Sequence, residues 1–134
     1  MTLCRRVALY LLAVFYGAAG VIHLAYAAPF IRITPVWVPQ PALVVALTGI
    51  AEIAGSLGLL QTWFPALRRA AGWGLALYAL CVWPANYNHM LLDMARPDHG
   101  AGLGYHIPRL AAQPLIIWLA LWVSGVTGWP WRRR

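Results

Sequence analysis

The apolar stretch from Leu43 to Leu60 carries a carboxyl group, Glu52, near its centre. A carboxylate in the middle of a bilayer costs about 2.5 to 3.5 kcal/mol, so such residues are rare and usually functional. At about 100° per residue, one helix face collects the small or polar residues, and membrane helices pack through such faces. That face comprises Val45, Thr48, Gly49, Glu52, Gly55, Ser56 and Leu59. The stretch therefore predicts an interior helix face that presents a carboxyl group to other helices.

Composition indicates an integral membrane protein with a single domain over residues 1–134. The chain is 62% hydrophobic and 10% charged, whereas a soluble domain is about half apolar and a quarter charged. Its net charge of +7 would suggest nucleic acid in a soluble chain. Here the arginines stand at the ends of apolar segments, where membrane topology explains them. We therefore expect the lipid bilayer, and no nucleic acid, as partner.

Four apolar segments predict an all-α fold, a four-helix transmembrane bundle with spans at about 7–28, 42–61, 70–90 and 109–128. A signal peptide competes for the first span, since Ala25-Tyr26-Ala27 is similar to a cleavage site. The apolar run is longer than a signal peptide requires, so we expect His23 to remain in the mature protein.

The connector from Pro29 to Pro41 contains four prolines, which forbid a continuous helix. It is too apolar for a solvated loop, so it either lies in the membrane interface as an anchor or covers the mouth of the bundle as a lid.

The arginines also predict the orientation of the chain. Seven fall on one side of the predicted membrane: Arg5, Arg6, Arg68, Arg69 and Arg132 to Arg134. Three fall on the other side: Arg32, Arg96 and Arg109. The positive-inside rule then puts both termini in the cytoplasm. We expect a multi-pass protein of a cell membrane, the inner membrane of a bacterium.

Each predicted span contributes a polar side chain to the interior. At about 1.5 Å per residue, His23, Asn86 and Gln113 fall in the outer leaflet and Glu52 nearer the midplane. Arg109 stands four residues before Gln113 and shares its helix face. These five residues are the candidate ligand-binding residues, and Glu52 is the candidate proton acceptor.

The order and spacing of several short motifs resemble the DoxX-like family of small four-helix membrane proteins. The matching motifs are Gly20-Val21-Ile22-His23 with Pro29-Phe30, Thr34-Pro35 to Pro39, Gly49-Ile50-Ala51-Glu52-Ile53 with Gly58-Leu59-Leu60, Arg68-Arg69-Ala70-Ala71-Gly72-Trp73-Gly74-Leu75, Pro84-Ala85-Asn86 and Arg109-Leu110-Ala111-Ala112-Gln113. The sequence departs from the family pattern at Leu24, where an aromatic residue is common, and at His99 and His106. The resemblance implies a four-helix fold and a link to quinone, because the family is named for a small subunit of an archaeal terminal quinol oxidase.

Three functions follow from these features. The first is a subunit of a membrane redox system that binds a quinone or another small lipophile, with Glu52 accepting a proton and a redox protein as partner. The second is a non-catalytic accessory protein whose polar residues only lock the helices, with Glu52 neutral or paired with Arg109. The third is a transporter of a small solute, for which no inverted repeat is visible. No cofactor motif is present, so quinone is expected only through the first hypothesis.

A metal site is a separate hypothesis for the histidines and the carboxyl group near the end of the third span. His89 and Asp93 stand four residues apart, and His99 and His106 follow in the glycine-rich segment from Arg96 to Pro108, which we expect to be an irregular loop. Histidine and carboxylate suit zinc, but the spacing matches no zinc signature. We therefore expect solvated histidines and no metal site. His89 and Asp93 are only weak candidates for metal ligands.

Overall fold

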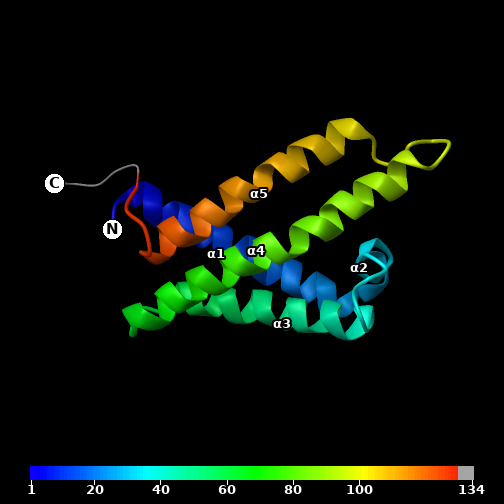
Figure 1. Cartoon of the computed structure of the whole chain (residues 1–134). Helices are drawn as coiled ribbons and strands as arrows, with labels where there is room; N and C mark the ends of the chain where they lie inside the picture. The colour runs from blue at the N-terminus through cyan, green and yellow to red at the C-terminus, as the bar shows by residue number, and fades with distance from the viewer. Residues whose placement is uncertain (130–134) are drawn as a thin grey trace.

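The computed structural model describes residues 1–129 and is all-α, as the sequence predicts. These residues form five helices: α1 (Leu3–Ala25), α2 (Ala27–Ile33), α3 (Pro41–Leu60), α4 (Pro65–Met94) and α5 (Leu103–Ser124). Figure 1 shows α1, α3, α4 and α5 packed into a bundle, with the short α2 beside one end of α3. Arg132 to Arg134, which enter the arginine count above, lie outside the described residues.

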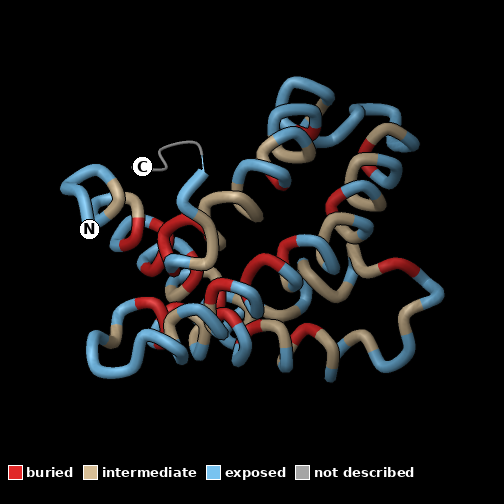
Figure 2. Tube along the Cα trace, turned by 60° about the vertical axis from the view of Figure 1, so that its left-hand side comes forward, coloured by how far each residue is buried: buried red, intermediate tan, exposed pale blue. Residues whose placement is uncertain are grey.

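Three of these helices, α1, α3 and α5, are long and apolar enough to cross a membrane, which is consistent with a membrane protein. The outer faces of the helices carry large apolar side chains, and Figure 2 shows exposed positions along the whole trace. The longest helix, α4, has 30 residues and a less apolar sequence. Its two buried polar side chains, Asn86 and Asp93, face the interior, whereas Trp73 and Leu77 are exposed.

The connector after α1 is not a continuous helix, as the sequence predicts, but its first part is helical. The helix α2 includes Pro29, which stands in its first turn. In a first turn the backbone N–H groups have no partner within the helix, so a proline is tolerated there. The helix ends at Ile33, before Pro35, and residues 34–40 are irregular.

The segment between α4 and α5 also differs from the expected long loop. The helix α4 continues through Pro84 to Met94, so Asn86 and Asp93 belong to one helix. The helix α5 begins at Leu103, where Gly102 is the N-cap with φ of 74°, a conformation that favours glycine. Residues 95–102 are therefore the whole loop, and Pro108 lies inside α5.

The small-residue face of α3 packs as the sequence predicts. A Cβ atom on Gly20 of α1 would lie 2.6 Å from the carbonyl oxygen of Gly49, and one on Gly49 would lie 3.0 Å from that of Gly20. The Ser56 hydroxyl donates a hydrogen bond to the carbonyl oxygen of Ala13 at 2.7 Å. Backbone approach of this kind requires glycine, and it brings α1 against the face that carries Glu52.

The apolar core fills the half of the bundle nearest the chain termini. Its buried side chains include Leu9, Tyr16, Leu59, Leu75 and Val123, which come from the four long helices. Figure 1 shows the N-terminus, the turn between α3 and α4 and the last described residues at this end. The segments 34–40 and 95–102 lie at the other end, where the helices enclose a cavity.

Candidate functional site

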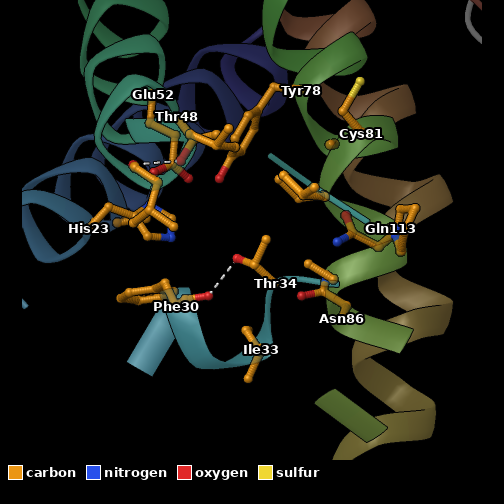
Figure 3. Close-up of a pocket in the computed structure, with 18 of the residues that line it drawn as sticks. His23, Phe30, Ile33, Thr34, Thr48, Glu52, Tyr78, Cys81, Asn86 and Gln113 are labelled. Atoms are coloured by element: carbon orange, nitrogen blue, oxygen red, sulfur yellow. Dashed lines mark hydrogen bonds and ion pairs between the residues drawn. The ribbon is translucent and has the colours of Figure 1, made fainter. Parts of the chain in front are cut away.

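A cavity of about 450 Å³ lies in the half of the bundle away from the termini. Its volume is in the range of natural ligand sites. Figure 3 shows side chains of α1 and α3 on one side, those of α4 and α5 on the other, and α2 closing a third side. The wall is mostly apolar, and all five candidate residues from the sequence line it: His23, Glu52, Asn86, Arg109 and Gln113.

His23 and Glu52 form a hydrogen-bonded pair across two helices. The Nδ1 atom of His23 on α1 meets the Oε2 atom of Glu52 on α3. Glu52 is 3% exposed, and the His23 ring packs edge-on against Phe30 of α2. The pair can hold its proton on the imidazole or on the carboxyl group with no change in net charge. Burial of Glu52 is therefore compensated by a partner that can also exchange a proton with it.

Arg109 does not pair with Glu52, so that form of the accessory hypothesis is wrong. Its guanidinium donates a hydrogen bond to Nδ1 of His89 at 2.9 Å and lies 5.6 Å from the centre of the Tyr105 ring. A guanidinium can only donate, so Nδ1 of His89 is the acceptor and its proton sits on Nε2. Arg109 still lines the cavity and gives that wall a fixed positive charge.

Asn86 and Gln113 present amide groups to the cavity. They come from α4 and α5, and Figure 3 shows both side chains directed inward. Asn86 is 8% exposed and Gln113 is 6% exposed. Within residues 1–129 neither amide forms a hydrogen bond to another side chain or to the backbone. The nearby Asn88 differs in this respect, because it donates a hydrogen bond to the carbonyl oxygen of Ile33. Amides whose role is to join helices would be paired, so these two are available to a ligand.

Tyr78 is a polar residue of the site that the sequence analysis does not single out. Its hydroxyl points toward the carboxyl group of Glu52 across the cavity in Figure 3. Tyr78, Val82 and Asn86 stand four apart on α4 and all line the cavity. This spacing could have predicted Tyr78 as a site residue, because it puts the phenol on the same helix face as the amide of Asn86.

The connector supplies one wall of the cavity. Phe30 and Ile33 of α2, and Thr34, Pro35, Trp37 and Val38 after it, are all lining residues. Asn88 of α4 donates a hydrogen bond to the carbonyl oxygen of Ile33 at 2.9 Å. These contacts favour a lid over a simple interfacial anchor, because the connector is bound to the bundle across the cavity.

A second polar cluster lies beyond the cavity, at the junction of α4, α5 and the loop 95–102. We define the outer cluster as His89, Asp93 and His106. Nε2 of His106 lies 2.9 Å from Oδ2 of Asp93, and Nε2 of His89 lies 3.5 Å from the same oxygen. The ligand atoms of the three side chains lie within 4.8 Å of one another. The expectation of solvated histidines is wrong for His106, which is 0% exposed.

The loop 95–102 is held by two carboxylates, that of Asp93 at the end of α4 and that of Asp98 within the loop. The backbone N–H of Ala101 donates to Oδ2 of Asp93 at 3.0 Å. The backbone N–H of Gly100 and the guanidinium of Arg96 both donate to Asp98, and they hold the pKa of Asp98 below its usual range. His99, whose φ is 56°, is exposed and stands apart from the outer cluster.

The fold and the site together define an all-α protein with membrane-length helices around one apolar cavity with polar groups in its wall. The sequence model of the Domain of unknown function (DUF8561) matches residues 12–124, and the chain belongs to this family. No curated protein and no solved structure matches the chain. The matched region contains every residue of the cavity and of the outer cluster.

Proposed function

We propose that this protein is a membrane-embedded binding subunit for a quinone or a similarly small lipophilic carbonyl compound, acting with a redox protein. One observation carries the proposal. The amide groups of Asn86 and Gln113, which have no hydrogen-bond partner among the described residues, face the His23–Glu52 pair across the apolar cavity. An apolar ring with carbonyl groups matches such a wall, because its carbonyl oxygens need donors and its ring needs apolar contacts. The DoxX-like resemblance supports the same ligand class.

The topology that we propose has four spans: the three apolar helices α1, α3 and α5, and the less apolar α4. At about 1.5 Å per residue, 30 residues give a helix of about 45 Å, longer than the hydrocarbon core of about 30 Å. Figure 1 shows the starts of α1 and α4, which hold Arg5 and Arg68, at one end of the bundle and the loop 95–102, which holds Arg96, at the other. With the positive-inside rule this supports cytoplasmic termini, in the inner membrane of a bacterium.

Each polar side chain then has a chemical task. The amide N–H groups of Asn86 and Gln113 donate to the carbonyl oxygens of the ligand. The His23–Glu52 pair gives or takes a proton when the partner protein supplies or removes an electron, so that charge on the ring is neutralised inside the membrane. Arg109 adds a positive charge that favours the ring oxygen as it becomes negative.

The competing function is the accessory one, in which the polar residues only lock the bundle. The His23–Glu52 pair and the Ser56–Ala13 hydrogen bond favour it, since both join α1 to α3. Such contacts are worth about 0.6 kcal/mol each in membrane proteins. The amides of Asn86 and Gln113 disfavour it, because side chains that join helices would be hydrogen-bonded to a neighbouring helix, whereas these two face the cavity.

The experiment is saturation binding of a short-chain ubiquinone analogue to the purified protein in lipid nanodiscs. We expect one site per chain, with weaker affinity in Asn86→Leu and Gln113→Leu while helicity and melting temperature stay near those of the native protein. Gly74→Ala is the matched control, because a Cβ there meets no atom within 4 Å. Native affinity in both leucine variants would contradict the proposal, as would the absence of saturable binding.

A further inference from the structure

We propose that the outer cluster, His89, Asp93 and His106, is a binding site for a divalent transition-metal ion of the zinc type. Two imidazoles and one carboxylate are a ligand set that zinc takes in proteins, with a fourth position left for water. The site is separate from the proposed ligand cavity, and the inference does not depend on the proposed function.

The distances in the outer cluster suit one central ion. Tetrahedral bonds of about 2.0 to 2.2 Å place neighbouring ligand atoms roughly 3.4 Å apart. Nε2 of His106 and Nε2 of His89 lie 2.9 Å and 3.5 Å from Oδ2 of Asp93. The remaining pair of ligand atoms lies within 4.8 Å, so rotation of one imidazole closes the set. The three ligand atoms therefore lie close to the arrangement that one ion requires, with one pair still to move together.

The backbone holds these ligands in a built site. His89 and Asp93 are one turn apart on α4, and His106 stands in the first turns of α5. Gly100, with φ of 50°, lies against Asp93 so closely that a Cβ would meet the carboxylate at 2.3 to 2.6 Å. The Ala101 N–H then reaches Oδ2 and fixes the carboxylate, as second-sphere donors do around metal ligands.

The hydrogen bonds of His106 do not explain why its ring is fully buried. Its ring is 0% exposed, its Nε2 contacts Asp93, and its Nδ1 has no partner among the described residues. Burial of the ring and the unpaired Nδ1 both cost stability. A bond from Nε2 to an ion would offset that cost more strongly than the contact with Asp93 alone, while Nδ1 would stay without a partner.

Metal binding also has a consequence for Arg109. In the metal-free arrangement Arg109 donates to Nδ1 of His89, so the His89 proton is on Nε2. An ion on Nε2 moves that proton to Nδ1, and the hydrogen bond from Arg109 must break. The guanidinium, which already lines the cavity, is then released from His89. Arg109 therefore competes with the ion, and its removal should tighten metal binding.

The test uses the purified full chain, stripped with a chelator and titrated with Co²⁺ and then with Zn²⁺. We expect one Co²⁺ per chain with the visible absorption of a tetrahedral site, displacement by Zn²⁺, and a rise in melting temperature with either ion. His89→Gln, Asp93→Asn and His106→Gln should each weaken binding at least tenfold. His99→Gln is the matched control, an exposed histidine of the adjoining loop.

Circular dichroism of each variant without metal separates loss of the site from loss of the fold. If His106→Gln unfolds, His89→Gln decides the question, since His89 is only partly buried. Arg109→Gln should bind Co²⁺ several-fold more tightly than the native chain. The proposal is overturned if the folded native chain binds no Co²⁺ saturably, if His89→Gln binds it as tightly as the native chain, or if His99→Gln abolishes binding.

Discussion

His23 of α1 and Glu52 of α3 form a hydrogen-bonded pair in the wall of the cavity, directly beside the point where Gly20 and Gly49 bring the two backbones together. The glycine contact sets the separation of the two helices. At that separation the imidazole of His23 and the carboxyl group of Glu52 are within hydrogen-bonding distance. A side chain in place of either glycine would push the helices apart and lengthen the contact between imidazole and carboxyl group. The packing of α1 on α3 and the chemistry of the cavity are thus coupled.

Gly20→Ala should destabilise the protein by about 1 to 3 kcal/mol, because the new Cβ lies 2.6 Å from the carbonyl oxygen of Gly49. Unfolding in mixed detergent micelles, followed by circular dichroism, measures this. Gly74→Ala, with no atom within 4 Å of its Cβ, should stay within about 0.5 kcal/mol of the native protein. Equal stability of the two variants would show that the close approach of α1 and α3 is not required.

Thiol labelling tests the proposed topology. After replacement of the exposed Cys4 and Cys81, a cysteine at Ala101 should react with an impermeant reagent added to intact cells. One at Ala66 should react only after the cells are opened. Both positions are exposed and lie at opposite ends of the bundle. Reaction at Ala66 and protection at Ala101 would reverse the orientation and place the cavity toward the cytoplasm.

Asn88→Ala should speed release of a bound quinone analogue without blocking binding. The side chain of Asn88 ties α4 to the connector at Ile33 through one hydrogen bond, worth about 1 kcal/mol. Loss of that much stabilisation corresponds to roughly fivefold faster dissociation. Stopped-flow dissociation measures this, with the exposed neighbour Tyr87→Ala as control. An unchanged rate would mean that the connector is an anchor and does not cover the ligand.

The sequence predicts those features that depend on one helix at a time. The face of α3 follows from its periodicity, and five of its seven members are buried: Val45, Gly49, Glu52, Ser56 and Leu59. The pairing of Glu52 with His23 depends on the register between two helices, which no periodicity within one segment contains. The same limit explains why Arg109 was matched with Glu52 in one hypothesis, although it contacts His89.

The helix α2 and the burial of His106 do not follow from the sequence, for local reasons. Four prolines predict that residues 29–41 form no continuous helix, which is correct because residues 34–40 are irregular, yet Pro29 occupies the first turn of α2, where it is tolerated. The glycines before Pro108 predict a loop, yet Gly102 is the N-cap of α5. That shift of the helix start carries His106 from a solvated loop into contact with Asp93.

Binding of a short-chain ubiquinone analogue to Glu52→Gln, compared with the native chain in the same nanodiscs, tests the central claim most directly. Glutamine keeps the shape and the hydrogen-bonding capacity of Glu52 but cannot exchange a proton with His23. The account predicts a folded variant with weaker binding and no proton uptake when the bound ring is reduced, with smaller defects in His23→Ala and Gln113→Ala. Native affinity together with native proton uptake in Glu52→Gln would contradict it and would leave the His23–Glu52 pair as a helix lock.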